Sequence, residues 1–154
     1  LVSSISFAQD SIAEVLKTYN TERIPYISAE DLSVSDTVII LLDAREANEF
    51  EVSHLKNAIH VGYDDFDIAT VTEILKDKSA KIVVYCSIGV RSEDIAEELK
   101  KEGYTNIYNL FGGIFEWKNK ENPVYNTNGE ETNNIHAFSK KWGKLLLKGT
   151  KIYD

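Results

Sequence analysis

Short apolar runs alternate with stretches of helical periodicity along most of the chain, and this alternation limits the possible folds more than any other feature. Strands are predicted at 24–28, 38–42, 58–61, 82–86 and 106–110, with helices at 46–52, 66–76, 91–102 and 114–120. The runs 38–42 and 82–86 are continuously apolar, as expected for strands covered on both faces. We therefore expect an α/β domain with a central, mainly parallel five-stranded sheet flanked by helices.

Two further helical segments are expected outside this alternation. An amphipathic helix is predicted at about 10–19, with Ile12 and Leu16 on its apolar face. After residue 119 the chain becomes rich in Asn, Thr, Glu and Gly with Pro123, which indicates a loop leaving the domain. A basic amphipathic helix at 137–148, carrying Phe138 and Trp142, is expected to dock on the domain, although such a helix can also bind a membrane surface or a partner. The predicted organisation is a leader (1–9), an N-terminal helix (10–23), the α/β domain (24–125) and a C-terminal extension (126–154).

Composition excludes several classes of protein. A length of 154 residues suits one domain, and a formal net charge of −8 argues against a broad contact with nucleic acid. A single cysteine cannot form an internal disulfide. One cysteine and three histidines in the whole chain are a poor supply of ligands for a structural zinc site, so none is expected. No apolar run approaches the roughly 20 residues that a membrane span requires, so stable membrane insertion is not expected.

The first residues resemble the end of a secretory signal peptide. The sequence contains no methionine, and the small residues Ser6 and Ala8 follow a short apolar stretch. We therefore expect a signal peptide and a periplasmic or secreted protein. The alternative is a frayed leader on a cytoplasmic protein.

The lone cysteine lies where a predicted strand runs into a loop and then a helix. Cys86 ends the apolar run 82–86, and the predicted helix begins at Arg91. The carboxyl end of a parallel strand opens into the usual ligand-binding crevice, and the next helix presents unpaired N–H groups that stabilise anions. Nucleophilic sulfur at neutral pH must be a thiolate, which these N–H groups and the Arg91 cation would stabilise.

Gly89 strengthens the case for chemistry at this loop. A glycine in the middle of the loop allows consecutive amides to converge on an anion or on a persulfide sulfur. A cysteine at the end of an apolar strand is otherwise most often an inert, buried residue. The combination of Gly89, Arg91 and the strand-to-helix setting favours a reactive Cys86.

Four motifs in order along the chain resemble the rhodanese-like sulfurtransferases. The active-site loop of many members reads Cys-x-x-Gly-x-Arg, which matches Cys86, Gly89 and Arg91. Segment 42–51 is similar to the family's Asp-x-Arg with Glu-(Tyr/Phe), and segment 53–59 is similar to its Gly-His-Ile-Pro-Gly-Ala-Ile. Segment 110–117, followed by Pro123-Val124, is similar to its Leu-x-Gly-Gly-x-x-x-Trp. This sequence departs from the second pattern, with Ser53 in place of Gly and Lys56-Asn57 in place of Pro-Gly.

The resemblance implies a sulfurtransferase without a metal or an organic cofactor. Cys86 would take sulfane sulfur from thiosulfate or a persulfide donor, hold it as a cysteine persulfide, and pass it to a thiol, protein or cyanide-type acceptor. Asp43 and Arg45, at the end of a neighbouring strand, are expected to tie the loop down. The loop that would hold the anionic sulfur consists of Ser87, Ile88, Gly89, Val90, Arg91 and Ser92.

Two other functions compete with this prediction. A cysteine-dependent phosphatase would also use a loop of amides with an arginine, but such enzymes use Cys-x5-Arg, and the spacing here is one residue shorter. A non-catalytic binding or sensing module is the second alternative, although inactive relatives commonly lack the cysteine. Because Glu93 and Asp94 place negative charge near the loop, we expect weak activity on thiosulfate and a persulfide or a protein as the donor.

Overall fold

The centre of the structure is a five-stranded parallel sheet. The computed structural model describes the backbone of residues 2–154 and the side chains of residues 11–154. The strand order is β1-β5-β4-β2-β3, and every neighbouring pair is parallel. The sheet strands are β1 (Tyr26–Ile27), β2 (Ile40–Asp43), β3 (Ile59–His60), β4 (Ile82–Tyr85) and β5 (Ile107–Leu110). The helices are α1 (Val2–Tyr19), α2 (Ala29–Ser33), α3 (Ala47–Val52), α4 (Ile68–Ile74), α5 (Arg91–Lys101), α6 (Gly113–Asn119) and α7 (Lys140–Gly143).

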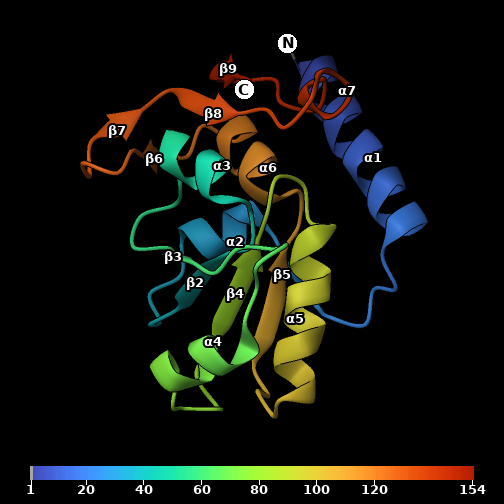
Figure 1. Cartoon of the computed structure of the whole chain (residues 1–154). Coiled ribbons are helices and arrows are strands. Elements are labelled where there is room, and N and C mark those ends of the chain that lie inside the picture. The colour runs from blue at the N-terminus through green and yellow to red at the C-terminus, as the bar shows by residue number, and fades with distance from the viewer. Residues whose placement is uncertain (1) are drawn as a thin grey trace.

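The central strand β4 divides the core into two apolar clusters. Its side chains alternate, so that Val83 and Tyr85 enter one cluster and Ile82 and Val84 the other. The first cluster contains side chains of α2 and α6, and the second contains side chains of α4 and α5. All four side chains are 0% exposed, which explains why the run reads as continuously apolar. The predicted α/β sheet with helices on both faces is thus confirmed (Figure 1).

All five predicted strands are present but shorter than predicted. The run 38–42 forms a strand only from Ile40, and Val38 is 91% exposed. The helices at the predicted positions lie within one or two residues of their expected ends, as α5 does at 91–101. Sequence periodicity did not predict α2, which is only five residues long and begins at the Ser28 N-cap.

The N-terminal helix is longer than predicted. It begins at Val2 rather than at about residue 10, and it ends at Tyr19 as expected. Ile12 and Leu16 are buried, in agreement with the predicted apolar face. The leader at 1–9 remains a prediction, and Leu1 lies outside the described residues. None of the helices in the described part of the chain has the length and apolar character needed to cross a bilayer.

The C-terminal extension differs from the single docked helix predicted at 137–148. The helix α7 covers only Lys140–Gly143, and it begins at the Ser139 N-cap, whose side chain accepts a hydrogen bond from the Trp142 N–H. Strands β8 (Asn134–His136) and β9 (Thr150–Ile152) flank it and pair in parallel. The predicted loop after residue 119 contains a hairpin of β6 (Val124–Tyr125) and β7 (Glu131–Thr132).

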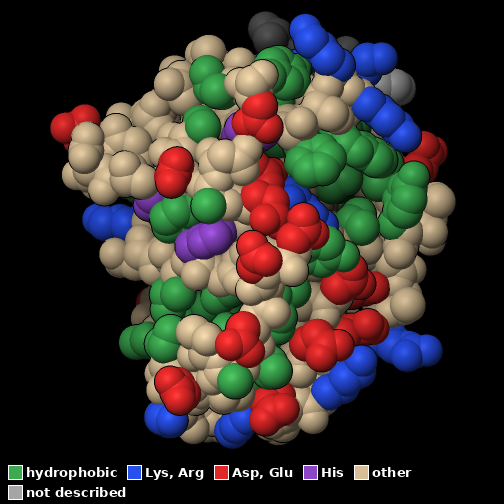
Figure 2. Space-filling view, viewed as in Figure 1, with side chains coloured by type: hydrophobic (Ala, Val, Ile, Leu, Met, Phe, Trp, Pro, Cys, Tyr) green, Lys and Arg blue, Asp and Glu red, His purple; other side chains and the backbone are tan. Residues whose placement is uncertain are grey.

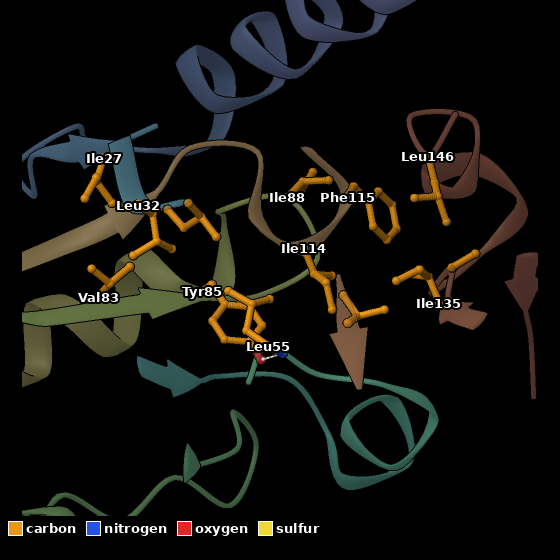
Figure 3. Close-up of a cluster of buried hydrophobic side chains, with 13 residues drawn as sticks. Ile27, Leu32, Leu55, Val83, Tyr85, Ile88, Ile114, Phe115, Ile135 and Leu146 are labelled. Atoms are coloured by element: carbon orange, nitrogen blue, oxygen red, sulfur yellow. Dashed lines mark hydrogen bonds between the residues drawn. The ribbon is translucent and has the colours of Figure 1, made fainter. Parts of the chain in front are cut away.

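The extension nevertheless docks on the domain, as predicted. Ile135 and Leu146 are buried in the same cluster as Tyr85 and Phe115, and Figure 3 shows them continuing the core beyond α6. In the same cluster the hydroxyl of Tyr85 accepts a hydrogen bond from the Leu55 N–H at 3.1 Å. The extension is therefore part of the folded core.

The turn between β5 and α6 brings α6 against the loop that follows β4. Gly112 and Gly113 have φ of +76° and +54°, a left-handed conformation that glycine adopts without strain. The Ile114 N–H donates to the Cys86 carbonyl at 3.0 Å, and the Phe115 N–H donates to the Ser87 carbonyl at 3.1 Å. A Cβ on Gly113 would lie 2.6 Å from the Ser87 carbonyl carbon and closer still to the Cys86 carbonyl oxygen. The glycine pair thus permits both this turn and the contact between α6 and the cysteine loop.

We predict that Gly113→Ala destabilises the fold far more than Gly129→Ala does. Gly129 has a similar positive φ of +77°, but a Cβ there would meet nothing within 4 Å. Gly129→Ala should therefore lower the free energy of unfolding by only about 1 kcal/mol, the cost of the left-handed backbone. Gly113→Ala adds a backbone clash and should cost about 3 kcal/mol or more. Urea unfolding of both variants measures the difference, and equal losses would contradict the close approach.

Candidate active site

Cys86 lies in a buried turn between β4 and α5, at the carboxyl end of the central strand. Its Sγ accepts a hydrogen bond from the Gly89 N–H at 3.1 Å and lies 3.4 Å from Ser92 Oγ. Ser92 Oγ has a single proton, and its shorter contact is the 2.7 Å hydrogen bond that it donates to Asn109 Oδ1. The Gly89 amide is therefore the firmest donor to the sulfur.

The hydrogen bonds from α6 orient the loop peptides. The carbonyls of Cys86 and Ser87 point toward α6, and in a planar trans peptide the next N–H points the opposite way. The N–H groups of Ser87 and Ile88 are thus turned away from α6. In the described part of the chain the N–H groups of Ile88, Val90, Arg91 and Ser92 donate to no protein acceptor. These groups remain free to bind an anion.

Two asparagines hold the turn in shape. The carbonyl of Gly89 accepts hydrogen bonds from Asn109 Nδ2 and from Asn20 Nδ2, both at 2.9 Å. Gly89 has φ +114°, and Leu16 of α1 lies 3.2 Å from the place that a Cβ would occupy. Neither Asn109 nor Asn20 was predicted from the sequence as part of the site. The available signal for Asn109 was a polar residue inside the otherwise apolar β5, where it is 0% exposed.

Arg91 closes the loop through an ion pair with Glu49. Arg91 Nη1 lies 2.8 Å from Glu49 Oε2, and Nη2 donates to Glu49 Oε1 at 2.9 Å and to Ser87 Oγ at 3.0 Å. Burial raises the pKa of Glu49, but the hydrogen bond and charge of Arg91 outweigh it and leave that pKa below its ordinary value. The guanidinium therefore has its strongest partners within the protein and braces the loop against α3.

Asp43 and Arg45 form a second ion pair behind the loop. Both are 0% exposed, and Arg45 Nη2 lies 2.6 Å from Asp43 Oδ2 and donates to the Ser53 carbonyl at 2.7 Å. Burial alone would lower the pKa of Arg45, but the charge and hydrogen bonds of Asp43 outweigh burial and leave that pKa above its ordinary value. The pair lies against the ring of Tyr85, 5.7 Å from the Arg45 guanidinium, so it reaches Cys86 through the preceding residue rather than by contact with the loop.

The acidic residues at the start of α5 are tied up in hydrogen bonds. Glu93 accepts from the backbone N–H groups of Thr21 and Glu22 at 2.7 and 3.0 Å, which fastens the segment after α1 to α5. Asp94 accepts from the Tyr63 hydroxyl at 2.7 Å, and this bond raises the pKa of Tyr63 to about 12. Glu93 therefore also acts as a structural latch, a role that the sequence analysis did not predict.

A cavity of about 180 Å³ opens onto the cysteine loop. Ile88 and Val90 of the loop line it together with Tyr19 from α1 and Phe138 and Trp142 from the C-terminal extension. Figure 2 shows hydrophobic side chains gathered between α1 and α7 on this face, with acidic side chains along the adjoining surface. Among the described residues, no three His, Cys, Asp or Glu side chains are grouped so that they could hold a metal ion.

We predict that Glu49→Gln destabilises the protein in a pH-dependent manner. Glutamine can still accept the 2.9 Å hydrogen bond from the Glu46 N–H, but its amide nitrogen replaces the oxygen that accepts from Arg91 Nη2 and Ser87 Oγ, so the substitution removes the charge and one acceptor. The loss in the free energy of unfolding should be about 2 kcal/mol at neutral pH. Because the folded pKa of Glu49 lies below 4.5, its contribution is complete above about pH 4.5 and disappears as the pH falls further.

Urea unfolding across the acidic range measures this difference between wild type and variant. A matched control is Glu98→Gln, which removes an exposed pair with Lys101 and should change stability by less than about 0.5 kcal/mol. If the difference in the free energy of unfolding between wild type and Glu49→Gln stays constant down to about pH 3, the Arg91–Glu49 charge pair is not the source of that difference.

Curated proteins of related sequence match the central part of this chain. A tRNA uridine(34) hydroxylase from Onion yellows phytoplasma is 41% identical over 91 residues, which cover 56% of this chain and 28% of that protein. The tRNA uridine(34) hydroxylase of Hamiltonella defensa is 35% identical over 109 residues, or 65% of this chain and 31% of that protein. The matched part of the chain therefore spans about 30% of the length of these curated relatives.

Solved structures show the same fold. The thiosulfate sulfurtransferase of Pseudomonas aeruginosa superposes with a TM-score of 0.62 at 21% identity, over 93% of this chain and 26% of that one. A rhodanese-related protein from Thermoplasma volcanium is 30% identical with a TM-score of 0.53, over 65% of this chain and 96% of that one. The family model of the rhodanese-like domain matches residues 28–120, which is more than half of the chain. This protein therefore belongs to the rhodanese-like domain family.

Proposed function

We propose that this protein is a sulfurtransferase that carries sulfane sulfur on Cys86. The observation that supports this most directly is the turn of Cys86, in which the Gly89 N–H donates to Sγ and neighbouring N–H groups of the loop have no acceptor among the residues that the structure describes. Such a turn can hold the negative charge of a thiolate and of the persulfide that it becomes.

The proposed reaction has two steps. The Cys86 thiolate attacks the outer sulfur of a donor, a new S–S bond forms, and the donor's own bond to that sulfur breaks with its electron pair. With thiosulfate the leaving group is sulfite, and the product on the protein is Cys86–S–S⁻. An acceptor thiolate or cyanide then attacks the outer sulfur, which regenerates the Cys86 thiolate. Neither step requires an external oxidant or reductant.

The residues around Cys86 have separate roles in this proposal. The free loop amides would hold the outer sulfur, while Arg91 positions the loop through Glu49 and Ser87. Asp43 and Arg45 fix the end of β2 beside Tyr85 and so support the strand that presents Cys86. The Glu49 contacts favour a role for Arg91 in steadying the loop over a role in orienting an anionic donor.

The alternatives have weaker support. The ring from Cys86 to Arg91 contains one residue fewer than the Cys-x5-Arg loop of phosphatases, and it fits a single sulfur better than a phosphoryl group. Hydroxylation of tRNA uridine is the activity in the names of curated relatives, of which the matched segment spans only about 30%. We do not propose a nucleic acid partner for this chain, because its formal net charge is −8.

We predict that treatment with thiosulfate, or with a low-molecular-weight persulfide, adds one sulfur atom to the protein. Intact-mass spectrometry should detect this adduct in the wild type and not in Cys86→Ser, because only the thiolate is nucleophilic enough to attack the donor. A thiol acceptor should then remove the added sulfur. The adduct should form more readily from the persulfide than from thiosulfate, since Arg91 is already paired with Glu49.

Two outcomes would contradict the proposal. A folded wild-type protein without an adduct from any sulfur donor would favour a binding module. A phosphate adduct on Cys86, or turnover of a phosphate ester that Cys86→Ser abolishes, would favour the phosphatase. Circular dichroism of both proteins verifies that a missing adduct does not reflect unfolding.

A further inference from the structure

We propose that the cavity beside Cys86 selects sulfur donors in which a neutral apolar group, preferably an aromatic ring, carries the transferable sulfur. This inference rests on the proposed sulfurtransferase function and adds the class of donor. The selecting residues are Tyr19, Phe138 and Trp142, which lie outside the segment 28–120 that the family model matches.

The three aromatic side chains form one wall at the cavity. The rings of Tyr19 and Trp142 meet edge to face with centroids 6.0 Å apart, although they come from opposite ends of the chain. Cζ of Arg91 lies over the ring of Phe138, 4.8 Å from the centroid of that ring. The wall therefore connects α1, the C-terminal extension and the cysteine loop at the point where a donor would approach Cys86.

The backbone of Phe138 is held in an unfavourable conformation. Its φ of +67° is rare for a bulky residue, and its N–H donates to Nδ1 of the buried His136 at 3.1 Å. A neutral His136 with Nδ1 as acceptor has its proton on Nε2, which lies 2.9 Å from Asp154 Oδ1. Strain of this kind persists only where the surroundings enforce it, and here it places an aromatic side chain that is 46% exposed beside the reactive loop.

The cavity is poorly suited to a small anion such as thiosulfate. Among the described residues that line it, the only cationic side chain is Arg91, which already pairs with Glu49 at 2.8 Å and is covered by Phe138. The free loop amides can accommodate one anionic sulfur, but the described residues that line the cavity offer no unpaired cation for a second charged group on the donor. The acidic side chains on the adjoining surface (Figure 2) add to the disadvantage of a doubly charged donor.

The cavity is equally unsuited to a cationic ligand. The aromatic rings could in principle form a cage for a quaternary ammonium group. However, Arg91 lies over Phe138, and Lys141 Nζ lies 4.7 Å from the centroid of the Trp142 ring. A neutral apolar group therefore fits the wall better than either charge.

The volume also suits an aromatic group. A dry apolar cavity of roughly 150 Å³ holds benzene. At about 180 Å³ the cavity beside Cys86 can admit a phenyl ring while the sulfur atom reaches Sγ. Burial of that ring would contribute to the affinity only for donors that carry it.

Thiosulfonate anions provide a matched pair of probes. In the proposed step Cys86–S⁻ attacks the terminal sulfur of R–SO₂–S⁻, the bond between that sulfur and the sulfonyl group breaks, and the sulfinate R–SO₂⁻ leaves. The products are Cys86–S–S⁻ and the sulfinate, so atoms and charge balance. Methanethiosulfonate and benzenethiosulfonate carry the same charge and differ in the apolar group.

The test compares kcat/KM for the two thiosulfonates with a common thiol acceptor. The baseline is the ratio of the rates at which the two thiosulfonates react with a simple thiolate in water. We expect the wild-type ratio of kcat/KM, benzenethiosulfonate over methanethiosulfonate, to exceed this baseline by about tenfold or more, because the phenyl ring is transferred from water into the cavity. Phe138→Ala and Trp142→Ala should each reduce this preference severalfold, and the double variant should approach the ratio in solution. The value for methanethiosulfonate should change by less than about threefold, since its methyl group makes little use of the wall.

Tyr153→Ala is the matched control, because it truncates an aromatic residue of the same extension that does not line the cavity. It should leave the donor preference unchanged. A wild-type preference for benzenethiosulfonate no greater than that of a simple thiolate in solution would overturn the inference, even if the alanine variants fail to fold. A preference that survives in a folded double variant would also overturn it. Failure of the proposed function has a different result, namely no Cys86-dependent sulfur adduct from either thiosulfonate.

Discussion

The candidate active site depends on the pair of backbone hydrogen bonds that α6 makes to the loop after β4. The N–H groups of Ile114 and Phe115 bind the carbonyls of Cys86 and Ser87, and this contact requires a residue without a side chain at Gly113. With those carbonyls fixed on α6, the following N–H groups face the other way. The orientation of the amides is thus set by a helix that contributes no side chain to the chemistry.

Buried charge holds the same region together from a second direction. Glu49–Arg91 braces the loop against α3, and Asp43–Arg45 fixes the strand end and the Ser53 carbonyl. Breaking either pair would leave a buried charge uncompensated, which costs more than the intact pair contributes. The two pairs therefore serve mainly to specify one geometry around Cys86.

The sequence allowed prediction of the features that depend on local pattern. The strands, the position of Cys86 and the turn at Gly89 follow from apolar runs, a lone thiol and a glycine, and the structure places them as expected. The choice of ion-pair partner is a different kind of question. Arg45 is four residues from Glu49, a spacing that suits an ion pair, yet Glu49 pairs with Arg91 because the fold brings α3 beside the cysteine loop, and Arg45 pairs with Asp43. Similarly, the amphipathic pattern at 137–148 could not show that β8 and β9 would pair with each other across a short helix.

The distribution of roles along the chain follows from this arrangement. The segment that matches the family model supplies strands β2 to β5, Cys86 and the oriented amides, all of which are fixed by core packing and buried hydrogen bonds. The terminal segments supply the aromatic wall, and they are attached by contacts that the family motifs do not encode: Leu16 and Asn20 on Gly89, Glu93 on the chain after α1, and Ile135 and Leu146 in the core. None of these anchors is a residue of the aromatic wall, so under the proposed function donor selectivity can vary independently of the transfer step.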